Sequence, residues 1–155
     1  MLDYMRISEE YRYKTELHAH TKPVSLCSEI TPEEIVRAYY EYGCDTLTVT
    51  NHLNPDWTPS RTDEYLSGYY DTKKAAEGTG MNVVLGVEIR FTENANDYLV
   101  YGVSFGDIEK MIRLIPYGIT EFYKEIKTRE NIILQAHPFR NGMTLAPLDS
   151  IDGIE

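Results

Sequence analysis

Segments with the side-chain pattern of strands alternate with helical segments along almost the whole chain, and this order limits the folds open to it. Six segments have the length and alternation of β-strands: residues 14–20, 45–52, 82–90, 98–103, 131–137 and 151–154. Helices are predicted between them, at residues 32–42, 61–77, 107–115 and 120–129. Strand followed by helix followed by strand predicts an α/β fold with a parallel sheet, either open or closed into a barrel.

The clearest helix boundaries in the sequence belong to the first helix. Thr31 is a predicted N-cap, Pro32 suits the first helical position, and Glu34 completes a capping box with Thr31. Gly43 is a typical residue for the end of such a helix. These signals predict a helix directly after the first strand and its loop.

Length and composition limit the class of protein. A chain of 155 residues, 42% hydrophobic and 26% charged, is typical of a single soluble globular domain spanning residues 1–155. Neither a signal peptide nor the ~20-residue apolar run of a membrane helix is recognisable, and two cysteines are too few for a disulfide framework, so a cytoplasmic location is expected. The net charge of −10 argues against a nucleic-acid-binding surface. It does not argue against a phosphorylated substrate, because bound cations can reverse the local field.

The chain contains only four histidines, and each lies at the C-terminal end of a predicted strand. They are His18, His20, His52 and His137. Active sites of α/β barrels and open α/β sheets form at that edge. One such histidine alone would be an ordinary structural residue, whereas the set of four indicates a metal site.

The spacing of His18 and His20 suits metal binding. Residues two apart in a strand point to the same face, about 6.5–7 Å apart, so both rings can lean onto one ion. Neutral imidazole suits Zn, Fe and Mn. Glu16 shares this face and could accept the other ring N–H of a ligand histidine, or could instead be a buried acid paired with a basic residue.

Glu88 interrupts an otherwise apolar strand, VVLGVEIRF. A lone buried carboxylate is costly unless it is paired or bound to metal, and Gly86 on the same face is expected to leave space beside it. Its two oxygens could bridge two ions. The alternative is an ion pair with Arg90, which lies on the same face of the strand.

With these motifs in this order along the sequence, the chain resembles the PHP family, the polymerase and histidinol phosphatase family of metal-dependent phosphoesterases. The resemblance runs over residues 14–155 and rests on the segments ELHAHT, TVTNHLN, GVEIRF, NDYLVYG, AHPFR and DGIE. It implies a distorted seven-stranded (β/α) barrel with two or three divalent ions, Zn, Mn or Fe, at its C-terminal face.

Carried over by position, the resemblance also implies a ligand set. His18 and His20 would bind one ion, and Glu88 would bridge two. His137 would bind a second ion, and His52 a third.

The sequence departs from the family pattern at several positions. Asn51 precedes His52 where members usually have aspartate. Asp97 stands where a histidine often lies, and as a metal ligand it would favour a harder ion or an altered third site. Cys27 is the nearest ligand-type residue after His20; its thiolate would favour Zn or Fe, although a small half-buried cysteine is an equal alternative. The late Asp-x-His pair of the family is absent.

The activity implied by the resemblance is hydrolysis of a small phosphomonoester by a metal-bound hydroxide, held by two ions ~3.5–4 Å apart. Glu88 and His137 would then be catalytic, and Arg140 would reach the phosphoryl oxygens. Lys22 could do the same, although surface charge is the preferred interpretation. Trp57 could stack on a substrate ring or simply pack in its loop.

Two other functions stay open, an amidohydrolase-like metal hydrolase and an incomplete, non-catalytic PHP-like domain. A (β/α) barrel typically takes ~250 residues, so we expect this barrel to be incomplete at its C-terminus, with an open sheet edge and an open side to the metal site. An unpaired edge invites another strand. We therefore expect either a longer natural chain or a homo-oligomer that covers the edge.

Overall fold

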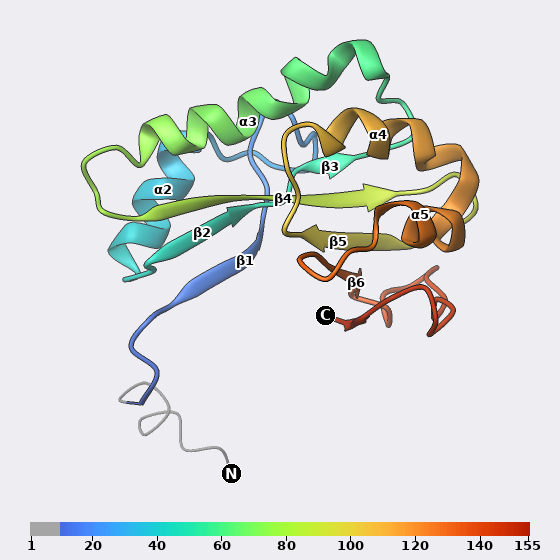
Figure 1. Cartoon of the computed structure of the whole chain (residues 1–155). Helices are drawn as coiled ribbons and strands as arrows, with labels where there is room; N and C mark the ends of the chain where they lie inside the picture. The colour runs from blue at the N-terminus through green and yellow to red at the C-terminus, as the bar shows by residue number, and fades with distance from the viewer. Residues whose placement is uncertain (1–9) are drawn as a thin grey trace.

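The structure is a computed structural model that describes residues 10–155. Its strands and α-helices alternate as the sequence predicts (Figure 1). The strands are β1 (Thr15–Ala19), β2 (Thr46–Val49), β3 (His52–Leu53), β4 (Asn82–Arg90), β5 (Asp97–Tyr101), β6 (Ile132–Ala136) and β7 (Gly153–Ile154). The helices are α2 (Pro32–Glu41), α3 (Thr62–Ala75), α4 (Asp107–Leu114) and α5 (Gly118–Ile126), with short 3-10 turns at Pro59–Arg61 and Ile115–Tyr117.

The strands form one mixed sheet, which corrects the expectation of a parallel one. The order is β1-β2-β4-β5-β6-β7, with β3 paired to β4 beyond the end of β2. Strand β5 runs antiparallel to both of its neighbours, and the other pairs are parallel. Only residues 91–96 connect β4 to β5, too few for the crossover that parallel neighbours require.

The sheet curls into a half-barrel. The hydroxyl of Tyr101 on β5 donates a hydrogen bond to the carbonyl of Leu17 on β1, 3.1 Å away, although two strands separate them in the sheet. In the described part of the chain β1 and β7 form the two edges, so the barrel does not close. The expectation of an α/β fold with an incomplete barrel is confirmed.

The predicted strand at residues 45–52 is broken into β2 and β3. The break falls at Thr50 and Asn51, whose polar groups bond to the first strand and its loop instead of continuing one ladder. The backbone N–H of Thr50 donates to the carbonyl of Ala19 at 2.8 Å, and Asn51 Oδ1 accepts the N–H of Thr21 at 2.8 Å. The chain thereby bends at the end of the strand that carries His52.

Helix α2 begins as its sequence predicts. Thr31 is the N-cap, its hydroxyl accepts the N–H of Glu34, and the Glu34 carboxylate accepts the N–H of Thr31 in return. Gly43 follows the helix with φ +80°, a conformation that glycine adopts without strain.

The helices cover one face of the sheet (Figure 1). The buried apolar side chains of these helices and of the strands form one cluster, which includes Leu47, Val87, Ile89, Ile35, Leu66, Met111 and Phe122. The apolar core therefore lies between the sheet and the helices. No helix among residues 10–155 has the length and apolar character needed to cross a membrane.

Asp152 fastens the last strand to the rest of the fold. Its carboxylate accepts hydrogen bonds from Lys127 Nζ at 2.7 Å, the Ile133 N–H at 2.8 Å and the Tyr123 hydroxyl at 3.0 Å. Burial opposes ionisation of Asp152, but these three partners outweigh it and hold its pKa below the ordinary value. The ionised form of Asp152 therefore stabilises the fold.

We expect Asp152→Asn to lower the free energy of unfolding at pH 7 by about 2 kcal/mol, because an amide cannot replace the charged acceptor of Lys127. A lowered pKa stabilises above the unfolded-state pKa of ~3.9 and loses that effect as the pH falls through the folded-state pKa. The difference between variant and wild type should therefore shrink in acid. Urea unfolding at pH 7 and pH 3 measures it, with exposed Asp71→Asn as the control. Equal stabilities at pH 7 would contradict the prediction.

Candidate metal centre

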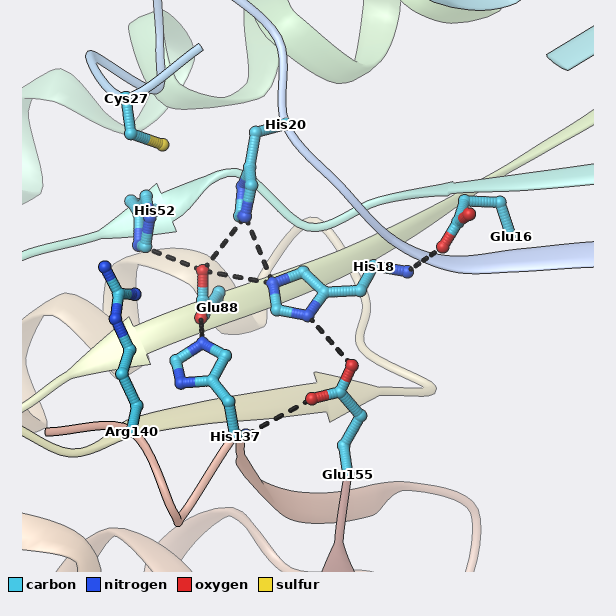
Figure 2. A pocket seen from close by; sticks show the side chains of 9 residues that line it. All are labelled: Glu16, His18, His20, Cys27, His52, Glu88, His137, Arg140 and Glu155. Carbon is cyan, nitrogen blue, oxygen red and sulfur yellow. Dashed lines mark hydrogen bonds and ion pairs between the residues drawn. The ribbon is translucent and has the colours of Figure 1, made fainter. Parts of the chain in front are cut away.

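Glu88 lies at the centre of the site, 1% exposed on β4 (Figure 2). The sequence suggested that Gly86, two residues before Glu88, leaves open space beside the carboxylate. The structure shows no such space. A Cβ at Gly86 would lie 2.8 Å from the methyl carbon of Thr50 and 3.0 Å from that of Thr48. The glycine instead lets β4 approach these threonine side chains, and this close packing supports the strand that carries Glu88.

All four histidines turn a ring nitrogen toward the Glu88 carboxylate (Figure 2). Glu88 Oε2 lies 3.3 Å from His18 Nε2 and 3.1 Å from His20 Nε2. It also lies 3.1 Å from His52 Nδ1. The other oxygen, Oε1, lies 3.1 Å from His137 Nε2. The two oxygens of one buried carboxylate thus face different histidines, which is the geometry that bridging of two positions requires.

The histidines come from three parts of the sheet. His18 lies in β1 and His20 just beyond it, His52 opens β3, and His137 follows β6. His137 has φ +34°, in the left-handed region that residues with a side chain rarely adopt. Backbone conformations of this kind concentrate at functional sites. The position of His137 is therefore held by the surrounding structure rather than by local preference.

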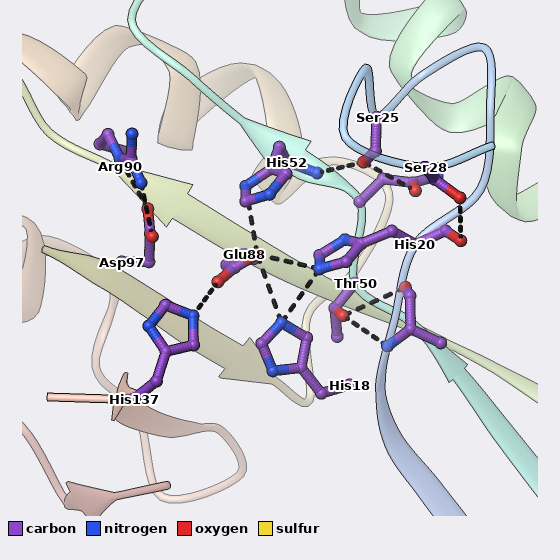
Figure 3. A network of polar contacts seen from close by, with 12 residues as sticks. His18, His20, Ser25, Ser28, Thr50, His52, Glu88, Arg90, Asp97 and His137 are labelled. Atoms are coloured by element: carbon purple, nitrogen blue, oxygen red, sulfur yellow. Dashed lines mark hydrogen bonds and ion pairs between the residues drawn. The ribbon is translucent and has the colours of Figure 1, made fainter. Parts of the chain in front are cut away.

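A buried polar network holds His52 in place (Figure 3). The His52 N–H donates to Ser25 Oγ at 2.8 Å, and the Ser25 hydroxyl donates to Asn51 Oδ1 at 2.9 Å. The Asn51 amide also donates from Nδ2 to Thr21 Oγ1 at 3.1 Å. An aspartate at position 51 could accept the hydrogen bond from the Ser25 hydroxyl, but it could not donate one to Thr21 Oγ1. Asn51 is thus explained by its hydrogen bonds to the loop after β1.

Three buried atoms of the cluster have no hydrogen-bond partner among residues 10–155: His20 Nδ1, His52 Nδ1 and Glu88 Oε2. Buried polar atoms in proteins are nearly always paired. Glu88 Oε2 and the histidine nitrogens around it are therefore close to one another without a hydrogen bond to Oε2, which leaves these atoms free to bind a ligand. Imidazole nitrogen and carboxylate oxygen are ligands of divalent transition metals, so the donor set fits such ions.

Within residues 10–155, three groups of side chains could hold an ion, each with its ligand atoms within 4.8 Å of one another. They are His18–Glu88–His137, His20–Cys27–His52 and His52–Glu88–Asp97. The atoms of His18 and His20 are also close, because their Nε2 atoms lie 3.1 Å apart. The cluster thus offers donors for more than one ion.

Charge in the site follows from the central carboxylate. Burial alone would raise the pKa of Glu88, but the rings of His18, His20 and His52 outweigh it and lower that pKa, so the carboxylate is ionised. Burial lowers the pKa of His52 and favours the neutral ring that metals bind. Burial also lowers the pKa of His18, but Glu88 and Glu155 outweigh it and the net shift is upward.

The sequence profile of the PHP domain family matches residues 16–153. The chain belongs to the PHP domain family. This confirms the resemblance, and the match spans every strand described above except the first residue of β1 and the last of β7. No curated protein sequence matches the chain.

Two solved structures are similar to this PHP domain. One is a protein from Bifidobacterium adolescentis, provisionally described as a metal-dependent phosphoesterase; its TM-score is 0.60 at 14% identity, over 94% of this chain and 77% of that chain. At this identity the likeness supports the fold. The other is an amidohydrolase from Chromobacterium violaceum with bound sulfate and no metal, with a TM-score of 0.49 at 19% identity over 72% of this chain and 36% of that chain.

The histidines around Glu88 line an open cavity of about 450 Å³ (Figure 2). The residues around it are Glu16, His18, His20, Cys27, His52, Glu88, His137, Arg140 and Glu155. Cys27 is exposed as a residue rather than half-buried. Partial desolvation of its thiol, together with the charge of Glu88, raises the pKa of that thiol. Cys27 nevertheless lies in one of the three donor groups, with His20 and His52.

Two residues near the cavity have roles that differ from the sequence interpretation. Glu16 accepts the backbone N–H of His18 at 2.9 Å, so this bond holds the strand rather than a ring nitrogen. Glu155 had no assigned role, yet it lies 3.3 Å from His18 Nδ1 and accepts the N–H of His137 at 3.2 Å. Two signals could have pointed to Glu155: it directly follows the last predicted strand, and it is the acidic residue that ends the segment DGIE.

Other predicted residues lie outside the cavity. Lys22 is exposed and does not line it. Trp57 is 8% exposed, with its ring edge-on to Tyr65 at 5.5 Å and the Arg61 guanidinium 4.2 Å from its centre, which supports the loop-packing interpretation. Asp97 lies near His52 and Glu88, but its carboxylate is already paired with an arginine.

Proposed function

We propose that this PHP domain is a metal-dependent hydrolase that cleaves a small phosphomonoester. The observation that carries the proposal is the division of the buried Glu88 carboxylate, with Oε2 facing His18, His20 and His52 and Oε1 facing His137. Divalent ions bound there would supply Lewis acidity for a phosphoryl oxygen and would lower the pKa of a water molecule. We further propose Zn, Mn or Fe, because the donors are imidazoles, a carboxylate and a thiol.

The protein's own groups would hold the substrate. Arg140 lines the cavity beside the histidines, and its guanidinium forms no ion pair with the described residues (Figure 2). A guanidinium matches two oxygens of a phosphoryl group and stays charged at all relevant pH values. Arg140 lies three residues after His137, and its backbone N–H donates to the His137 carbonyl at 3.0 Å. This turn brings the arginine close to the histidines around Glu88.

Metal analysis combined with a substrate panel tests the proposal. Purified protein should contain Zn, Mn or Fe by elemental analysis and should hydrolyse an aryl phosphate such as p-nitrophenyl phosphate, with loss of activity after chelation. Hydrolysis of amides or lactones instead would favour the amidohydrolase-like function. Bound metal without turnover on either class would favour a non-catalytic domain, and absence of metal would contradict the proposal.

Arg140→Gln should lower kcat/KM for the phosphomonoester by ~100-fold, because one charged donor to the phosphoryl oxygens is lost. Metal content should stay unchanged, since Arg140 is not a ligand. Lys22→Gln is the matched control, because Lys22 is exposed and lies outside the cavity. Steady-state kinetics and elemental analysis on the same preparations measure both effects. An Arg140→Gln rate equal to that of the control would remove Arg140 from the proposed site.

A further inference from the structure

Arg90 and Asp97 form an ion pair beside the metal cluster (Figure 3). The two residues lie directly opposite each other on the antiparallel strands β4 and β5. Arg90 Nε donates to Asp97 Oδ1 at 2.7 Å and Arg90 Nη2 donates to Asp97 Oδ2 at 2.6 Å. Both oxygens of Asp97 are therefore engaged by one guanidinium.

Asp97 is the donor on which a third ion would depend. The groups His18–Glu88–His137 and His20–Cys27–His52 share no residue, so together they supply six donor side chains. The remaining group takes His52 and Glu88 from those two and adds only Asp97. However these six donors are divided between two ions, Asp97 is the only side chain that the third group adds to them.

The pair also places a fixed positive charge where a third ion would lie. A guanidinium stays protonated at every relevant pH, and it neutralises the Asp97 carboxylate that would otherwise attract a cation. The Asp97 side chain is 1% exposed and that of Arg90 is 37% exposed, so water screens the pair only in part. A divalent ion at Asp97 would have to approach the guanidinium as well as the carboxylate.

We infer that Arg90 is a positioning residue that withholds Asp97 from the metal cluster and limits this site to two ions. The inference rests on the proposed function, since it concerns the number of ions that the same site binds. It assigns Asp97 to an ion pair instead of the coordination that its position in the sequence suggested. Arg90 thereby determines how many metal ions are bound next to the substrate.

Counting bound ions tests the inference without any activity assay. Wild type, Asp97→Asn, Arg90→Gln and Arg90→Lys would be dialysed against Mn²⁺ or Zn²⁺ and analysed by inductively coupled plasma mass spectrometry. We expect two ions in wild type and two in Asp97→Asn, because Asp97 is not a ligand. Arg90→Gln should bind three, since it releases the Asp97 carboxylate. Arg90→Lys keeps the positive charge and should bind two.

Two results would overturn the inference: loss of an ion in Asp97→Asn, or a count in Arg90→Gln equal to that of wild type. Removal of Arg90 leaves a buried carboxylate unpaired, and this variant could fail to fold without metal. In that case the wild-type and Asp97→Asn counts decide, because equal counts of two support the inference and a loss on substitution contradicts it. A wild type that binds no ion would contradict the proposed function instead.

Discussion

Glu88→Gln is expected to abolish tight metal binding and turnover while leaving the fold intact. The amide has the size of the carboxylate, but it is neutral and offers one acceptor oxygen where the wild type offers two. Since Oε1 and Oε2 face different histidines, the substitution affects both sides of the cluster at once. Loss of even a residue that only orients a ligand costs ~10–100-fold in metal affinity, so the loss here should be at least ~100-fold.

Metal titrations and thermal unfolding of the same preparations separate binding from folding in this variant. Metal-free Glu88→Gln should still unfold in one cooperative transition, because the amide keeps the shape of the carboxylate, but at a lower temperature than the metal-free wild type, because the charge that faces the histidine rings is lost. Glu41→Gln, at the exposed end of α2, is the matched control and should bind metal normally. A Glu88→Gln protein with wild-type metal content and rate would reduce Glu88 to a structural acid.

The residues that meet in the site could be predicted because each is marked locally. A histidine at a strand end or a carboxylate in an apolar strand is visible within a few residues of sequence, as in the segments around His18 and Glu88. Parallel strands then bring their ends to one edge, so residues distant in sequence become neighbours. Of the strands, only Asn82–Arg90 has the predicted bounds. The capping box of α2 was equally local and is confirmed.

The direction of β5 and the pairing of Arg90 depend on contacts between strands and could not be read locally. Arg90 shares a face with Glu88, and the sequence left an ion pair between those two as the alternative to metal binding by Glu88. The reversal at residues 91–96 places Asp97 directly opposite Arg90, where the guanidinium reaches both of its oxygens. A cross-strand neighbour with this geometry is a better partner than a residue two positions along the same strand.

The contacts of Glu155 and Asn51 likewise could not be predicted from the local sequence. Glu155 reaches the backbone of His137 because β7 pairs with β6, and it reaches His18 because the sheet curls and brings β1 close to β7. Asn51 satisfies the loop after β1 through its amide, which the pattern of one strand does not reveal. The roles of side chains that connect two elements therefore could be found only from the tertiary structure. The roles of side chains at the end of one element could be predicted from the sequence.

His18→Ala and His20→Ala should each remove one ion and most of the turnover, and the double variant should remove the same single ion. The two Nε2 atoms lie 3.1 Å apart, and both lie within 3.3 Å of Glu88 Oε2, so the two rings can share one ion. Once that ion is lost with the first ligand, the second substitution has nothing further to remove. Elemental analysis after dialysis against Zn²⁺ or Mn²⁺ gives the counts.

The double variant makes this test sharper than either single change. The donor groups also permit a division in which His18 joins His137 and His20 joins Cys27 and His52. Under that division the double variant would lose two ions, and the effects of the single variants would add. Thr15→Ala, an exposed change in the same strand, should keep every ion. Full metal content in both single variants would remove the pair from the ligand set, because neither ring would then hold an ion.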